Sequence, residues 1–466
     1  MAIERSRTAA SGEPLLIDHS HGLRKGALSP LETLAQSISS IAPTAGPTVL
    51  IPLAFALSGN GTWFAYLLAT VALCLVAGNI GVFARHSASP GSLYTYTASV
   101  FPGPVGRLSA WALLIAYIAT ASAVTGGLTN YANLLLHALF GIQASGVLIT
   151  AIVVSLATWI AYRDVKISAR VMLAFEVVSV SLISLIIVAS LWKHGPHLDV
   201  DQFALHGASA GPIRLGLVIA IFSFVGFESA TTLGVEAKDP LRTVPRAVIL
   251  SAIFAGFFFM GCAYAEVLAF KTAHHDLSTS SAPLRLLAGE TGLQALDPLI
   301  DLGAVFSFFA CALSCITASA RVLLIMARDG LAHGRLADVH HRNATPGKGV
   351  ILSGILCFLP PAILAQRGAT GFDINGWMGS LATYGFITSY IFVCVAMPVH
   401  LFRLNQLSAR PILLSASATL FMTAALVSSI YPIPPASYSS LIVLFFVYML
   451  AGFLWSAYAH RKSSRQ

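Results

Sequence analysis

The chain has 466 residues, of which 56 % are hydrophobic and 10 % are charged, and its formal net charge is +8. A soluble protein carries about 25 % charged residues, so this composition excludes an ordinary soluble protein and indicates a chain embedded in a lipid bilayer. The positive charge is distributed according to membrane topology, and no nucleic-acid partner is expected.

The first 28 residues are polar and basic. They lack the apolar stretch and cleavage site of a signal peptide, so residues 1–28 are expected to form a cytoplasmic tail. Apolar segments follow, each near the ~20 residues needed to cross a bilayer. They predict an all-α membrane protein with twelve transmembrane helices, at 31–57, 62–83, 105–136, 145–162, 169–192, 213–234, 246–270, 298–326, 349–366, 377–402, 411–430 and 437–459. The third is too long for one upright crossing, so it is expected to begin as an amphipathic piece or to tilt strongly.

Twelve crossings place both termini on the same side of the membrane. If that side is the cytoplasm, the outer loops hold five of the 27 lysines and arginines, and the inner segments hold the other 22. This asymmetry follows the positive-inside rule and predicts cytoplasmic termini in a plasma membrane. The five outer residues are Lys193, Arg214, Lys271, Arg285 and Arg367.

The first helix contains a predicted break. In "SISSIAPTAGPTVLIPL", Ser37 to Leu53, Pro43 and Pro47 bracket a short segment that includes Gly46. Proline removes a backbone donor and clashes with the preceding turn, so this spacing should unwind the helix. Unpaired backbone groups are tolerated at membrane depth only inside protein or beside a cavity. The two open interpretations are a kinked packing helix and a discontinuous helix that lines a substrate cavity.

The sixth helix contains a second predicted break, in "FSFVGFESATTLGVEAKDPLRTVPRAV", Phe222 to Val248. Gly226 weakens the helix, and Glu228 is an ionisable group at membrane depth, which by default faces a cavity. Helices one and six are the first of two successive sets of five, where transporters with inverted repeats have their broken helices.

The two breaks together predict a site for a zwitterion. Free amides at the start of the outer half-helix, near Gly46–Thr48, suit a carboxylate. Free carbonyls at the end of the half-helix near Phe222–Val225 suit an ammonium group. The candidate substrate-binding residues are Ala42, Thr44, Ala45, Gly46, Phe222, Ser223, Phe224 and Val225.

Three stretches resemble motifs of the amino acid–polyamine–organocation (APC) transporter superfamily. The stretch from Phe222 to Val248 resembles the family's sixth helix and following loop. "SPGSLYTYTASVFPGPVGRLSAW", Ser89 to Trp111, resembles the start of the third helix, with Ser92 in place of a glycine. "RVLLIMARDGLAH", Arg321 to His333, resembles the loop after the eighth helix. The resemblance covers nearly the whole chain.

The resemblance implies a secondary transporter of amino acids or related amines with a five-plus-five inverted repeat. Carried over by position, Phe222 is the aromatic gate, and Ser223, Phe224 and Val225 present carbonyls to the amino group. Glu228 is the acidic residue linked to pH sensitivity. The first helix departs from the family's Gly-[Ser/Thr]-Gly pattern. The implied divisions are a transporter core at 29–402, helices 11 and 12 at 403–460, and a cytoplasmic tail at 461–466.

The coupling ion is predicted from the buried acids. Some proton-coupled relatives have a lysine on the fifth helix at the position of Ser179, and this chain lacks it. Glu176, one turn earlier, is either a neutral hydrogen-bonded glutamate or a proton carrier, because burial disfavours its charged form. Sodium coupling would use Ser314 and Thr317 and is the less favoured alternative. Glu266 and Asp301, near outer helix ends, are expected to be interfacial or structural. The predicted coupling residues are therefore Glu228 and Glu176.

Several alternatives stay open. A transporter of polyamines or other organic cations would need more carboxylates near the site than Glu176 and Glu228, so a neutral amino acid is favoured. A channel or a non-transporting sensor is the alternative of another class. No nucleophile–base pair, metal cluster or ATP-binding motif occurs, so no enzyme, metal or cofactor is expected. Oligomeric state, direction and stoichiometry stay open.

Overall fold

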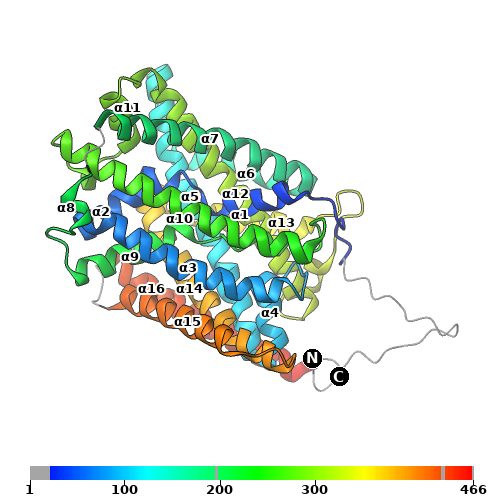
Figure 1. Ribbon diagram of the computed structural model, residues 1–466. Coiled ribbons are helices and arrows are strands. Elements are labelled where there is room, and N and C mark those ends of the chain that lie inside the picture. The colour runs from blue at the N-terminus through cyan, green and yellow to red at the C-terminus, as the bar shows by residue number, and fades with distance from the viewer. Residues whose placement is uncertain (1–20, 195–197, 432–435, 464–466) are drawn as a thin grey trace, which may run out of the picture.

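The computed structural model describes residues 21–194, 198–431 and 436–463 of the chain (Figure 1). Residues 1–20 of the predicted N-terminal tail and 464–466 of the predicted C-terminal tail lie outside these ranges. The regular secondary structure of the described residues is helical, apart from one isolated parallel bridge between Leu28 and Ala237, and turns and loops connect the helices. The α-helices are α1 Pro30–Ile41, α2 Ile51–Ser58, α3 Thr62–Ala84, α4 Ser92–Val100, α5 Gly103–Phe140, α6 Gly146–Arg163, α7 Val165–His194, α8 Val200–Phe203, α9 Ala210–Phe224, α10 Pro240–Thr272, α11 Pro283–Glu290, α12 Asp297–Arg328, α13 Gly347–Gln366, α14 Gly371–Arg403, α15 Ala409–Ile430 and α16 Ala436–Ser463.

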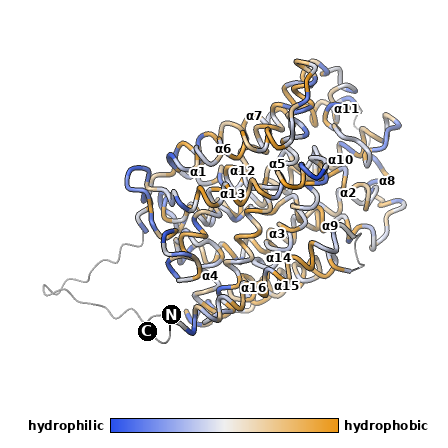
Figure 2. Tube along the Cα trace, turned by 180° about the vertical axis from the view of Figure 1, so that it is seen from behind, coloured by the Kyte–Doolittle hydropathy of each residue, from blue (hydrophilic) through white to orange (hydrophobic). Residues whose placement is uncertain are grey.

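Eleven stretches of the described residues are long and apolar enough to cross a membrane. The first, Pro30–Ala84, has 55 residues and contains α1, α2 and α3. At ~1.5 Å per residue a helix of that length would span roughly 80 Å, far more than one bilayer core. Two crossings within this stretch would make the total twelve, the predicted number, which stays a prediction together with the inverted repeat. Figure 2 shows apolar residues along the helices and hydrophilic residues gathered at the two ends of the bundle.

The centre of the bundle is built from α5 and α12, whose most apolar windows are each 78 % buried, against 17 % for α16. Small residues allow the central helices to approach closely. A Cβ atom added to Gly126 of α5 would lie 2.6 Å from the Gly371 carbonyl oxygen at the start of α14. α5 therefore packs closely against both α12 and α14.

The third predicted helix is one continuous helix, α5, of 38 residues. It does not begin as an amphipathic piece, because the chain bends at Phe101 and Pro102 and the preceding polar segment forms the separate helix α4. A helix of this length rises about 57 Å, so it either tilts strongly or extends beyond the hydrocarbon core, and the strong tilt stays a prediction.

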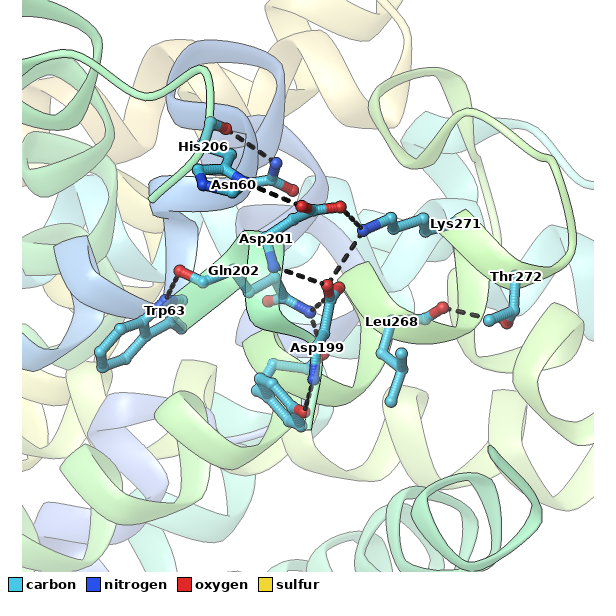
Figure 3. Close-up of polar contacts among 10 residues, drawn as sticks. Asn60, Trp63, Asp199, Asp201, Gln202, His206, Leu268, Lys271 and Thr272 are labelled. Atoms are coloured by element: carbon cyan, nitrogen blue, oxygen red, sulfur yellow. Dashed lines mark hydrogen bonds and ion pairs between the residues drawn. The ribbon is translucent and has the colours of Figure 1, made fainter. Parts of the chain in front are cut away.

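A network that we call the α8 clamp closes one end of the bundle (Figure 3). Lys271, at the end of α10, donates to Asp199 Oδ1 (2.9 Å) and Asp201 Oδ2 (2.5 Å) at α8. Trp63 of α3 donates to the Gln202 carbonyl oxygen (2.8 Å), and Asn60 to that of His206 (2.9 Å). The clamp thus joins the start of α3, the loop before α9 and the end of α10.

The two carboxylates of the α8 clamp are electrostatically stabilised. Partial burial alone would raise the pKa of Asp199, but the hydrogen bonds from Lys271, Gln202 and the Asp201 amide, with the charge of Lys271, together outweigh this effect, and the pKa lies below its ordinary value. The same ammonium group lowers the pKa of Asp201. Both carboxylates are therefore ionised at neutral pH.

Candidate functional site

The first helix is broken where the proline pair predicts it. α1 ends at Ile41, and Ala42 adopts a left-handed conformation with φ 50°. A short π-helix, η1, then runs from Gly46 to Leu50 and leads into α2. Among the described residues, the backbone amides of Thr44 and Gly46 have no hydrogen-bond acceptor, and the buried Thr44 hydroxyl also lacks a partner. These groups are available to a ligand.

The sixth helix is also broken where predicted. α9 ends at Phe224, Val225 is extended and Gly226 has φ +93°. A short 3-10 helix, η3, follows from Ser229 to Leu233, instead of a regular inner half-helix. The carbonyls of Phe222 and Phe224 accept from the amides of Val225 and Phe227, both at 3.3 Å. Within the described part of the chain, those of Ser223 and Val225 have no donor.

The two breaks touch one another. A Cβ atom on Gly226 would lie 2.7 Å from Ser40 Cβ and 2.9 Å from the Ser40 carbonyl oxygen, so only glycine fits against the last turn of α1. The Ala230 amide donates to Ser37 Oγ (3.0 Å), and the Ser229 hydroxyl donates to the Gln36 carbonyl oxygen (3.0 Å). The candidate substrate-binding residues of both helices therefore belong to one buried region.

Glu228 is fully buried directly after the second break. Its Oε1 accepts from the hydroxyl of Tyr117 on α5 (2.8 Å), and its Oε2 accepts from that of Tyr390 on α14 (2.6 Å). The Tyr390 hydroxyl oxygen in turn accepts from the Gly226 amide at 3.4 Å. The carboxyl group thus anchors the unwound segment to two neighbouring helices.

Phe222 lies between the breaks and a cavity at the α8 end of the bundle. The cavity has a volume of about 400 Å³ and is lined mainly by leucines of α2, by α9 and by α14. The Phe222 ring packs on Gly379 of α14, where an added Cβ would come within 2.3 Å of it. This position, at the wall of an apolar vestibule, is the one that a gate would need.

An aromatic cluster backs the candidate site. Phe259 of α10 contacts Tyr66 and Phe224, with ring centroids 5.9 and 5.3 Å apart, and it leaves no room for a Cβ atom at Gly46. The Tyr66 hydroxyl pairs with Ser223 Oγ at 2.8 Å. Because the ring of Phe224 is buried in this cluster, its contribution to a site is limited to its backbone.

The opposite end of the bundle is closed by a buried ion pair. Arg321 of α12 donates to both oxygens of Glu236 (2.7 and 2.8 Å), and the two side chains are 2 % and 0 % exposed. Next to the pair, Leu28 donates to the Glu236 carbonyl oxygen (2.9 Å) and accepts from Lys238 (2.8 Å). We call this arrangement the inner lock; it fastens the segment before α1 to the loop after η3.

Among the other predicted coupling residues, Glu176 is bound to α12, whereas Ser314 lies beside the first break, where its hydroxyl pairs with Ser40 Oγ. Both oxygens of Glu176 accept from Ser307 of α12 (3.1 and 3.3 Å), and Ser179 donates to the Gly303 carbonyl oxygen (2.6 Å). Ser314 is hydrogen-bonded to α1, since its hydroxyl donates to the Gln36 carbonyl oxygen (3.0 Å). The Thr317 hydroxyl has no partner among the described residues.

Sequence reasoning missed Tyr117, Tyr390 and the Glu236–Arg321 pair. The tyrosines lie in the middle of apolar helices, where a hydroxyl group carries no periodic signal. Glu236 stands in a charged stretch after the second break, and its burial depends on an arginine 85 residues later. An arginine inside an apolar helix is itself a signal for a buried partner.

The profile of the protein family described as "Amino acid permease" matches residues 28–453. The chain is 22 % identical over 358 residues to the branched-chain amino acid permease BcaP of Bacillus subtilis, covering 73 % of this chain and 74 % of that protein. It is 27 % identical over 342 residues to the low-affinity putrescine importer PlaP of Escherichia coli, covering 71 % of each.

Among solved structures, the chain is similar to a Na⁺-coupled sialic acid symporter in a substrate-bound, outward-open state. The TM-score is 0.56 at 13 % sequence identity, and the match covers 88 % of this chain and 91 % of the symporter. This similarity concerns the fold.

Proposed function

The chain belongs to the amino acid permease family of the APC superfamily, and from this premise we propose that it transports neutral amino acids across the cell membrane by alternating access. The observation that carries the proposal is the pair of touching helix breaks. One break offers the Thr44 and Gly46 amides, and the other offers the Ser223 and Val225 carbonyls. Donors on one side and acceptors on the other complement a carboxylate and an ammonium group.

The proposed path runs from the apolar cavity past Phe222 to the breaks, with Phe222 as the gate. The inner lock closes the other side in this conformation. Transport then requires the lock to open and Phe222 to seal the vestibule. Coupling to protons or exchange of one substrate for another would drive this cycle, with Glu228 and Glu176 as the coupling residues proposed from the sequence.

Polyamine transport is the second candidate, because PlaP is a putrescine importer. A diamine needs a carboxylate at each end of its site. Beside the breaks, Glu228 already accepts from two tyrosines, whereas Glu176 is bound to Ser307. This arrangement favours the zwitterion.

Counterflow in proteoliposomes tests the proposal. We expect radiolabelled leucine, valine or alanine to accumulate in vesicles preloaded with the same amino acid, and putrescine not to do so. A matched pair of variants controls for folding: Gly226→Ala, which fills the contact between the breaks, should abolish counterflow, and Gly261→Ala, which faces open space, should retain it. Exchange of putrescine alone would establish the second candidate, and exchange of none of these compounds would contradict both.

A further inference from the structure

Glu266 of α10 carries a buried carboxyl group that has no part in the candidate site at the two helix breaks. Its side chain is 0 % exposed, so protein encloses it near the end of α10. Neither carboxylate oxygen has a hydrogen-bond partner among the described residues. In this respect it differs from Glu228 and Glu176, which accept from tyrosine and serine hydroxyls.

The titratable groups within electrostatic range of Glu266 are uncharged or already paired. They are Cys262 one turn earlier, Tyr66 of α3 and Tyr131 of α5. Tyr131 also lies within range of Arg285 and Asp301, which bind one another. No ion pair in the described part of the chain includes Glu266. Lys271 of the same helix is bound to the α8 clamp, and on α7 Arg170 is bound to Glu32 and Lys193 to Glu290.

An ionised carboxylate in this position would be uncompensated. Removing such an ion from water is strongly unfavourable even after the protein relaxes, unless a cation or hydrogen-bond donors replace the water. Glu266 has neither in the described part of the chain. A bound proton removes the charge and with it most of this cost.

We propose that Glu266 is a proton-binding site of the transporter, loaded in this conformation and unloaded when helix movements admit water. Two tyrosines within electrostatic range of Glu266 bind the breaks. The hydroxyl of Tyr131 donates to the Thr48 carbonyl oxygen in η1 (3.3 Å), and that of Tyr66 pairs with Ser223 (2.8 Å). A charge on Glu266 is therefore felt at both ends of the candidate substrate site.

This position gives a physical basis for coupling, which rests on the proposed function. An ionised Glu266 repels a substrate carboxylate held by the amides of the first break, whereas a protonated Glu266 does not. Substrate and proton consequently favour one another's binding, and by linkage the effect is reciprocal. Release of either one weakens the binding of the other.

Infrared spectroscopy of the purified full-length protein tests the proton site without any substrate. We expect the carboxylic acid C=O band of the wild type at neutral pH to lose intensity in Glu266→Gln and to keep it in Glu290→Gln, a control at an exposed ion pair. Because glutamine and leucine mimic a neutral group, Glu266→Gln and Glu266→Leu should keep the wild-type Tm. An unchanged band, or a lower Tm in both variants, would overturn the proposal.

Transport assays separate a failure of this inference from a failure of the proposed function. If amino acids exchange, Glu266→Gln should retain exchange and lose the pH dependence of net uptake, and unchanged pH dependence would refute a coupling role. If no amino acid exchanges, the infrared experiment still tests the proton site independently of the proposed function. Stabilisation of the wild type by sodium chloride over choline chloride, absent in Glu266→Gln, would identify a sodium ligand instead and would also overturn the proton site.

Discussion

Glu228 shows how one side chain can hold an unwound segment in place. Its two oxygens accept from Tyr117 and Tyr390, and Tyr390 accepts from the Gly226 amide, so a chain of three hydrogen bonds replaces the missing helical ones. Each member of such a buried network depends on the others.

Replacing Tyr390 with phenylalanine should destabilise the protein by about 1–3 kcal/mol, because it leaves a Glu228 oxygen and the Gly226 amide unpaired in the interior. The measurement is thermal unfolding in detergent. Tyr384→Phe is the matched control, since its hydroxyl has no hydrogen-bond partner in the described part of α14 or around it. Equal Tm values for the two variants would show that the network contributes nothing.

Gly226 is the residue at which the backbone itself requires glycine. We expect Gly226→Ala to cost at least the ~1–2 kcal/mol of a left-handed conformation, and more because its Cβ would press against Ser40. Gly261→Ala, with nothing within 4 Å, should be neutral or raise the stability by up to about 1 kcal/mol as a helix former. Thermal unfolding of both variants distinguishes strain at the break from a general effect of alanine.

At the scale of elements, the sequence predicts the positions of both breaks but not what they contact. The proline pair and Gly226 are local signals, and the helices end at Ile41 and Phe224 as such signals require. The contacts of Glu228 and the burial of Glu266 depend on helices packed from distant parts of the chain. Periodicity carries no information on them, because central helices are apolar on every side.

The inner lock should behave as a coupled pair. Arg321→Met alone leaves the buried Glu236 carboxylate uncompensated, and this should lower the free energy of unfolding by about 3–5 kcal/mol. Glu236→Gln alone leaves the buried Arg321 guanidinium only half-satisfied. The double variant Arg321→Met, Glu236→Leu should recover part of that loss, and a double-mutant cycle of unfolding free energies measures the coupling. Additive single effects would contradict a paired lock.

The stabilisation that the α8 clamp gives to the folded protein should decrease in acid. The pKa values of Asp199 and Asp201 are depressed in the folded protein, so their contribution is present above the ordinary aspartate pKa and disappears as pH falls through the lower folded value. Lys271→Met should therefore lower the Tm at pH 7, and this difference should shrink progressively as pH falls below the ordinary aspartate pKa. Lys348→Met, which removes an exposed ion pair with Asp338, is the control. A Tm difference that persists in acid would show that the lysine stabilises by packing.

At the scale of the whole molecule, the helical membrane fold could be predicted almost entirely from composition and apolar segment length. Segment ends were less accurate: α10 begins at Pro240, six residues before its predicted start, because a proline is tolerated in a helix's first turn. The division at residues 29–402 and 403–460, the twelve crossings and the cytoplasmic termini stay predictions.

Charge asymmetry predicts that the α8 end faces outwards. In intact bacterial cells, a membrane-impermeant maleimide should label His275→Cys, in the exposed turn after α10, and should not label His341→Cys, on the opposite end, until the cells are opened. The six native cysteines lie in helices, and those described as buried should react slowly. Labelling of His341→Cys first would reverse the topology.

The α8 clamp has a consequence for how the protein could be controlled from outside. It couples the start of α3 and the end of α10, two helices that run side by side, to the loop before α9 (Figures 1 and 3). The clamp therefore ties the loop before α9, the helix that leads into the second break, to a pair of packed helices. An antibody fragment that binds residues 198–209 would hold this loop against the two helices and would inhibit transport without entering the substrate path.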